Sequence, residues 1–186
     1  MMKWELSNIS VEQEGIDSFN TFPRLFRRIL IFFVAIILLL YFIPINVLMA
    51  SNFNSDKYLK TWSLKDCESF TVLYTHSVEL CPVTETYIIE NDHIILTETY
   101  FESYGAGLPA TTPYKFEKTD KGFRIYEINK KIEDLVYRTG GVIANHGISL
   151  KEKEYKFLDF SSPREGVRLK IKSIPLLQYF IREVLQ

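Results

Sequence analysis

The sequence has few cysteines, and they do not form a metal-binding or redox pattern. Cys67 and Cys81 are the only two in 186 residues, and the spacing C-x-x-C is absent. The chain also lacks a surplus of either charge, because its formal net charge is −1 at pH 7. Nucleic acid is therefore not expected as a partner. No phosphate-binding loop, nucleophile elbow or metalloprotease helix occurs, so no familiar catalytic motif is present.

One stretch contains no charged side chain at all. Residues 29–45 read ILIFFVAIILLLYFIPI, and apolar residues continue past Asn46 to Ala50. A bilayer core of about 30 Å needs about 20 such residues in a helix. A core helix of this length would normally show a polar stripe, which is missing here. We therefore predict a membrane-spanning helix over residues 29–50, with Pro44 in its last turns.

The charges beside this stretch predict its orientation. Arg24, Arg27 and Arg28 precede it directly. The first basic residue after it is Lys57. Since positive flanks stay in the cytoplasm, residues 1–28 are expected inside and the rest of the chain outside. A cleaved signal peptide is the alternative, but the apolar run exceeds the usual core of about 7–15 residues, so a single-pass anchor in the cell membrane is favoured.

The remaining chain shows the patterns of a β-rich domain. Aromatic residues, which favour strands, make up 15% of the sequence. We expect a connector over residues 51–66 and one domain over residues 67–186, beginning with a three-stranded antiparallel meander. The predicted strands cover residues 68–74, 84–89, 94–104, 114–118, 122–128, 136–139, 147–150, 155–160 and 167–172. This spacing predicts a mainly β fold, a small antiparallel sandwich or barrel.

The C-terminal segment has helical spacing instead. Ser173 is placed to cap a helix and Pro175 to stand in its first turn. Apolar residues recur every three or four positions, which predicts an amphipathic helix from Pro175 to Gln186; they are Leu176, Leu177, Phe180, Ile181, Val184 and Leu185. Packing of this apolar side on the sheet is expected. Contact with the membrane or with a partner protein is the alternative.

The two cysteines both fall in the outer domain, where an oxidising compartment permits a disulfide. In the predicted first hairpin, Cys67 lies at the far end of one strand and Cys81 lies in the turn. Their α-carbons would then exceed the ~7 Å that a disulfide allows. We therefore expect two thiols, with a disulfide as the alternative.

Two glutamates are predicted to face each other across the meander. With the turn centred on Asn91-Asp92, Glu85 and Glu98 stand nearly opposite on adjacent strands. Like charges in this position are destabilising unless a cation or basic group lies between them. One hypothesis is that both carboxylates converge with His76 and His146 on a metal ion or a small polar ligand. A solvated, hydrogen-bonded patch that fixes the hairpin is the alternative.

An ordered series of motifs resembles a known family. The motifs are His76-Ser77-Val78-Glu79, Pro82-Val83 with Glu85, Leu96-Thr97-Glu98-Thr99, Gly105-Ala106-Gly107-Leu108-Pro109, and Gly140-Gly141-Val142-Ile143-Ala144-Asn145-His146. In this order, over about Phe70 to Leu150, they resemble the small bacterial family named domain of unknown function 1850. The resemblance does not cover the two ends of the chain.

The resemblance implies a role in transport. Members of that family are typically encoded beside tripartite periplasmic-type (TRAP) transporters of the TAXI class, whose solute receptors bind substrates outside the membrane. It therefore implies an accessory subunit that contacts the TRAP transporter membrane subunit or the TAXI-type receptor. We expect this subunit to be non-enzymatic and to have no cofactor. A ligand- or metal-binding sensor module and an envelope hydrolase are the alternatives.

The residues expected on the functional surface come from the same motifs. They are His76, Ser77, Glu79, Glu85, Glu98, Gly105, Gly107 and His146. For the two glycines, a role in backbone conformation is as good an explanation as contact with a partner. Catalysis by Ser77 with His76 is disfavoured, because adjacent residues of a strand point to opposite faces.

Overall fold

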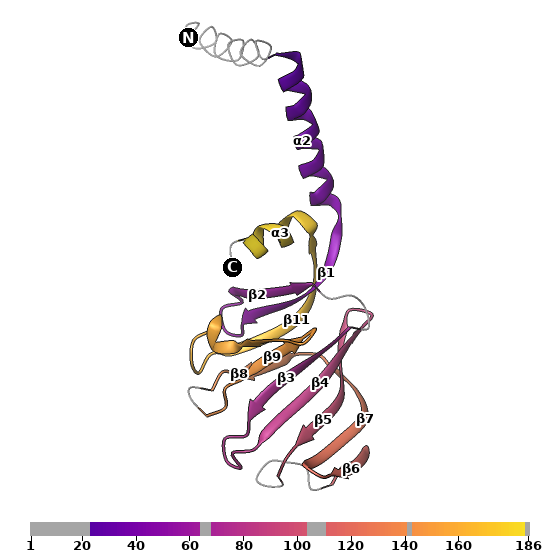
Figure 1. The fold of residues 1–186 in the computed structure, drawn as a ribbon, viewed down its shortest axis with the longest axis vertical. Coiled ribbons are helices and arrows are strands. Elements are labelled where there is room, and N and C mark those ends of the chain that lie inside the picture. Colours follow the sequence, from indigo (N-terminus) through magenta and orange to yellow (C-terminus); the bar gives the residue numbers. More distant parts are fainter. Residues whose placement is uncertain (1–22, 64–67, 104–110, 141–142, 185–186) are drawn as a thin grey trace, which may run out of the picture.

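The computed structural model describes residues 23–63, 68–103, 111–140 and 143–184. The helices in these ranges are α2 (Arg24–Phe42), α3 (Leu176–Val184) and the 3₁₀ helix η1 (Phe157–Asp159) (Figure 1). The strands are β1 (Pro44–Asn52), β2 (Tyr58–Ser63), β3 (Ser69–Thr75), β4 (Pro82–Glu90), β5 (His93–Phe101), β6 (Lys115–Thr119), β7 (Gly122–Ile132), β8 (Leu135–Arg138), β9 (Gly147–Leu150), β10 (Lys153–Lys156) and β11 (Gly166–Pro175).

The strands form two antiparallel sheets. Sheet A has four strands in the order β2-β1-β11-β8, and sheet B has seven in the order β10-β9-β3-β4-β5-β7-β6. The main core lies between the sheets and includes the fully buried Leu48, Phe70, Ile148 and Leu169. The predicted mainly β fold of the sandwich type, with a helix at each end, is confirmed.

A second, smaller cluster of buried residues comes from sheet B and the turn between β3 and β4. It contains Cys81, Val83, Phe101, Ile125 and Ile128. The Cys81 thiol is free and buried, with its Sγ 3.9 Å from the carbonyl oxygen of Ser103. Cys67 lies outside the described residues, so the expectation of two thiols stays a prediction.

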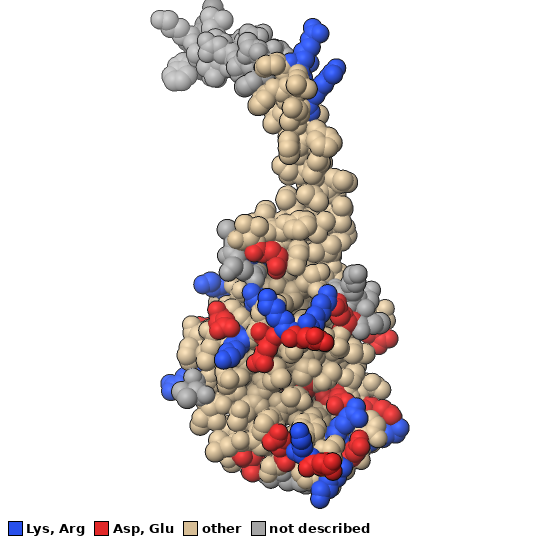
Figure 2. Space-filling model, in the orientation of Figure 1, with Lys and Arg blue, Asp and Glu red and all other residues tan. Residues whose placement is uncertain are grey.

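α2 is a 19-residue helix with no buried residue. At about 1.5 Å per residue it is about 28 Å long, close to the thickness of a bilayer core. It is long and apolar enough to cross a membrane. Figure 2 shows its surface free of charge along most of its length, with the basic side chains at the end far from the sheets. The arginines that precede the apolar run, Arg24, Arg27 and Arg28, form the start of this helix.

The predicted helix end at Ala50 is wrong. The helix stops at Phe42, and Ile43 is already extended with φ −84° and ψ 109°, because a residue before proline disfavours the helical region. Pro44 then begins β1, in which Val47 to Ala50 are buried. A strand buried on both faces reads as a continuous apolar run, so the sequence could not separate it from the helix before it.

The predicted connector over residues 51–66 is likewise wrong for its described part. β1 extends to Asn52, and β2 pairs with it antiparallel through contacts such as Leu48 opposite Trp62. Thr61 and Trp62 are buried. The folded domain therefore begins at Pro44, with only Ile43 between it and the end of α2, rather than at residue 67.

Most of the remaining strands follow the sequence prediction. The meander β3-β4-β5 and the hairpin β6–β7 are confirmed. Asn91 and Asp92 have φ angles of 47° and 63°, the left-handed pair that a two-residue hairpin turn requires. The strand predicted over 155–160 is largely wrong, because β10 ends at Lys156 and η1 follows.

The C-terminal helix is confirmed, but its start and its packing differ from the prediction. Ser173 and Pro175 belong to β11, whose alternation continues to the buried Ile174. Pro175 pairs with Pro44 of β1 rather than opening the helix. The expected packing of the apolar side on the sheet is wrong, since Phe180 and Ile181 are about half exposed.

Candidate functional site

A carboxylate lies between the two sheets and is held by tyrosine hydroxyls. Glu85 sits on the face of β4 that looks toward sheet A, and Tyr87 follows two residues later on the same face. The Tyr87 hydroxyl donates to Glu85 Oε2 at 3.1 Å and lies 2.6 Å from the Tyr137 hydroxyl. Tyr137 comes from β8 of sheet A and also donates to Glu85 Oε2. The cluster therefore ties sheet B to sheet A through polar contacts.

An aromatic stack borders this cluster. The His146 ring lies between Tyr74 and Phe157, with ring centroids 5.2 Å and 6.0 Å away. Tyr137 contacts the same imidazole at 5.8 Å. His146 is 9% exposed, and its Nδ1 accepts a hydrogen bond from the backbone N–H of Gly140 at 3.3 Å. We refer to Tyr74, Glu85, Tyr87, Tyr137 and His146 as the tyrosine–glutamate cluster.

Burial fixes the protonation states of the cluster. It raises the pKa of Tyr74, Tyr87 and Tyr137 above the ordinary tyrosine value, and the charge of Glu85 raises it further. Burial also lowers the pKa of His146 below 6.5. At neutral pH the three tyrosines are thus hydrogen-bond donors and the imidazole is uncharged. Such a set can orient a carboxylate, but none of its tyrosines is activated as a base.

A cavity of about 370 Å³ adjoins the cluster on the side of β5 and β7. Tyr74 and Glu85 form one edge of it. Its other lining residues are Val83, Leu96, Thr99, Thr111, Thr112, Pro113, Tyr114, Ile125, Ile128 and Lys130. Apolar walls with a few polar groups are typical of small-molecule sites, and the carboxylate would favour a ligand with a donor or cationic group.

A comparison with protein-family models matches this part of the chain. Residues 70–157 match the family described as Domain of unknown function (DUF1850). Residues 70–157 belong to this family. No curated protein and no solved structure matches the chain. The resemblance to the 1850 family is therefore confirmed.

The DUF1850 region contains the whole tyrosine–glutamate cluster. It spans most of sheet B together with β8 and ends at Phe157, the residue that stacks on His146. α2, β1, β2, β11 and α3 lie outside it. The family match thus covers the site between the sheets, whereas both helices are additional to it.

The predicted opposition of Glu85 and Glu98 is wrong. Glu85 pairs with Thr99 and Glu98 pairs with Thr86, because the register shifts by one residue between Thr86 and Tyr87. A one-residue slip moves a side chain to the other face of the sheet. Glu98 therefore lies on the outer face of sheet B, where Arg124 binds its Oε2 at 2.5 Å.

His76 has a local structural role in the β3–β4 turn. Its Nδ1 accepts a hydrogen bond from the backbone N–H of Glu79 at 3.2 Å, and the backbone N–H of His76 donates to the carbonyl of Cys81 at 2.9 Å. Ser77 is exposed beside it. The predicted convergence of His76, Glu85, Glu98 and His146 is wrong, and residues 23–63, 68–103, 111–140 and 143–184 contain no group of three metal-ligating side chains.

The remaining predicted residues fall into two groups. Gly105 and Gly107 lie outside the described residues. His146 lies beside Tyr137, which binds Glu85. The loop before His146 needs glycine at position 140, because an added Cβ would come within 2.5 Å of the Ala144 Cβ. The tyrosines were missed. Tyr87 could have been predicted from the sequence, because residues two apart on a strand point to the same face, and Tyr87 follows Glu85 by two positions.

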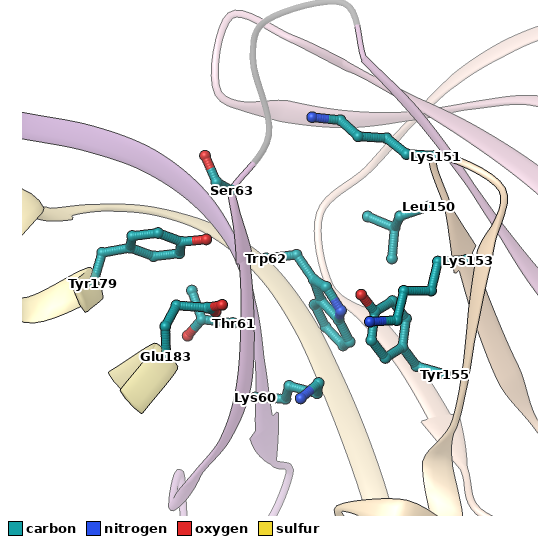
Figure 3. A pocket seen from close by; sticks show the side chains of 10 residues that line it. All are labelled: Lys60, Thr61, Trp62, Ser63, Leu150, Lys151, Lys153, Tyr155, Tyr179 and Glu183. Carbon is teal, nitrogen blue, oxygen red and sulfur yellow. The ribbon is translucent and has the colours of Figure 1, made fainter. Parts of the chain in front are cut away.

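A second hollow, of about 460 Å³, lies between β2, the β9–β10 hairpin and α3 (Figure 3). Its floor is aromatic, with the Trp62 and Tyr155 rings 5.7 Å apart. The ammonium groups of Lys60 and Lys153 lie 5.5 Å and 5.1 Å from the Tyr155 ring. Trp62 Nε1 is buried, and it has no hydrogen-bond partner within the described part of the chain. Sequence patterns did not indicate this hollow, because its residues come from three distant segments.

Proposed function

We propose that this chain is a membrane-anchored, non-enzymatic accessory subunit of a TAXI-class TRAP transporter. α2 anchors it in the cell membrane, with the N-terminus in the cytoplasm and the β-sandwich outside. The sandwich acts by protein–protein contact with the transporter's membrane subunit or with its TAXI-type receptor. The partner assignment follows what the family resemblance implies.

The observation that carries the proposal is the junction between α2 and the sandwich. The apolar helix ends at Phe42, and β1 begins at Pro44. The Ile43 carbonyl between them accepts the backbone N–H of Leu176 at 2.8 Å. With no flexible linker in between, a helix that spans the membrane holds the sandwich against the bilayer. This position suits a protein that acts on a membrane complex rather than on a diffusing substrate.

The charge distribution supports the orientation. The basic residues Arg24, Arg27 and Arg28 lie in the first turns of α2, at the end away from the sheets (Figure 2), and positive charges beside an apolar span stay cytoplasmic. The described part of α2 carries no acidic residue in its first turn that would offset them.

Co-purification from membranes tests the partner. The tagged full-length chain is solubilised gently, and the proteins that accompany it are identified by mass spectrometry. The control carries α2 fused to an unrelated outer domain. Enrichment of a TRAP membrane subunit or a TAXI-type receptor over this control supports the proposal. Recovery of the chain alone, under conditions in which the transporter's own subunits stay together, contradicts it.

The cavity beside Glu85 favours a second candidate, a ligand-binding sensor. Its volume of about 370 Å³ suits a small molecule. Native mass spectrometry of the protein as purified would then show a bound small molecule. Ile128→Trp, which fills the cavity, should remove that mass, whereas Phe116→Trp on β6 should not. An unoccupied wild-type protein from several growth conditions argues against this candidate.

A further inference from the structure

The two sides of α3 face opposite surroundings. Residues 179, 182 and 183 recur at helical spacing and face the sandwich. Tyr179 and Glu183 line the hollow over β2 and point toward that strand (Figure 3). The Arg182 guanidinium lies 4.3 Å from the centroid of the Tyr58 ring and donates to the sulfur of Met49 at 3.7 Å. The polar side of the helix is therefore the side that packs on the domain.

The apolar side of α3 faces away from the domain. Phe180 is 49% exposed, Ile181 51% and Val184 85%. These residues and Leu177 fall at i, i+3, i+4 and i+7, so they form one stripe along the helix. A surface helix of a soluble protein normally turns such a stripe toward the core. α3 does the reverse, which indicates that its outer surroundings are apolar.

The position of α3 identifies those surroundings. β1 and β11 pair so that Pro44 stands opposite Pro175, which brings the end of α2 beside the start of α3. The hydrogen bond from Leu176 N–H to the Ile43 carbonyl links the two helices directly, and they contact each other. In Figure 1, α3 lies across the end of the sandwich from which α2 leaves it. If α2 spans the bilayer, α3 lies at the level of the outer surface of the bilayer.

We infer that α3 is an interfacial membrane helix. It lies on the outer leaflet beside the anchor, with Leu177, Phe180, Ile181 and Val184 at the boundary between headgroups and acyl chains. Such helices bury their apolar face about 5–10 Å into this boundary. The polar side, with Tyr179 and Glu183, stays with the sandwich. The inference rests on the proposed anchoring through α2, and it adds a second membrane contact that orients the domain.

Lipid is the occupant rather than a protein partner because the stripe is continuous with the exposed surface of α2. Both helices expose apolar side chains near the point where they meet: Phe42, the last residue of α2, is 75% exposed, and Phe180 of α3 is 49% exposed. A bilayer that surrounds α2 must reach this level on all sides that α2 exposes. Vesicles of pure lipid contain no partner protein. Burial of the α3 stripe in such vesicles therefore distinguishes lipid from a protein partner.

Tryptophan quenching by brominated lipid tests the inference. The full-length chain is reconstituted into phosphatidylcholine vesicles with and without bromine on the acyl chains. Phe180→Trp and Val184→Trp place the probe on the stripe. Phe116→Trp is the matched control, because Phe116 is a 43% exposed phenylalanine on β6, in the part of sheet B farthest from α3. The wild-type protein gives the background of Trp4 and Trp62.

We expect the emission added by Phe180→Trp and Val184→Trp to shift to shorter wavelength and to be quenched by bromine. The emission added by Phe116→Trp should not change. Equal quenching at all three positions, or none at 180 and 184, overturns the inference. Flotation of the same vesicles separates this failure from failure of the anchor. If the protein floats with the vesicles but shows no quenching at position 180, the anchoring through α2 stands and only the inference about α3 fails. If the protein does not float, both fail.

Discussion

The helical end of the molecule and the interior of the sandwich both depart from the usual placement of side chains, but in opposite directions. At the helical end, α2 and the outer side of α3 expose apolar residues. Between the sheets, a carboxylate, a histidine and three tyrosines lie among aromatic rings. The first departure is stable only if the solvent there is itself apolar. The second needs only internal hydrogen bonds, and the structure supplies them.

With α2 as the proposed anchor, the difference separates the features that depend on a membrane from those that do not. The tyrosine–glutamate cluster lies in the DUF1850 region and is satisfied by residues of the same domain. The helices lie outside that region, and many of their apolar side chains are exposed. Substitutions at the two places should therefore fail in different assays: membrane attachment for the helices, folding stability for the cluster.

The largest effect is expected for charges in the middle of α2. Phe33→Arg with Val34→Arg places two cations at the bilayer centre, at about 2.5–3.5 kcal/mol each. The chain should then be lost from the membrane fraction after alkaline extraction. Phe33→Leu with Val34→Leu is the matched control and should remain there. A double-arginine chain that stays embedded would show that α2 does not span the membrane.

A smaller effect is expected when a hydroxyl of the cluster is removed. Tyr137→Phe takes one donor from Glu85 and should lower the free energy of unfolding by about 1.5–3 kcal/mol, the usual range for a hydrogen bond to a charged group. Denaturant unfolding of the full-length chain in mild detergent measures it. Tyr126→Phe, on the outer face of β7, should change little. Equal losses for both variants would contradict the assigned role of the cluster.

Lowering the pH should weaken the fold through His146. Because burial lowers its pKa below 6.5 in the folded state, the unfolded chain binds the proton first. The stability contributed by the neutral imidazole is thus complete above about pH 6.5 and declines as the pH falls below it. Thermal unfolding between pH 7.5 and 5.5 should show this decline in the wild type. His146→Gln should flatten it, and an unchanged slope would contradict the prediction.

The smallest effect is expected on the outer face of sheet B. Glu98→Gln weakens the ion pair with Arg124, and both side chains are partly exposed. Exposed pairs contribute little, so the unfolding midpoint should barely move. Glu85→Gln, measured alongside, should lower it clearly. If the two variants lose the same stability, the assignment of Glu85 and Glu98 to opposite faces is wrong.

How far the sequence predicts this molecule depends on the range of the contacts involved. Local patterns located the β3-β4-β5 meander, the turn at Asn91-Asp92 and the helical spacing of α3. They failed where one apolar run changes from helix to strand at Pro44, since both states give the same composition. They also failed at the bulge beside Thr86, where one residue moves Glu98 to the other face. The site itself joins Glu85 to Tyr137 across 52 residues, and no spacing rule predicts such a contact.

Cysteine accessibility in intact cells tests the central claim most directly. Lys121→Cys puts a thiol at the exposed β6–β7 turn, and a membrane-impermeant maleimide reports its side of the membrane. The wild type gives the background from Cys67 and the buried Cys81. We expect Lys121→Cys to be labelled in intact bacterial cells, above this background and without permeabilisation. Labelling only after the membrane is opened would place the sandwich in the cytoplasm and contradict the account.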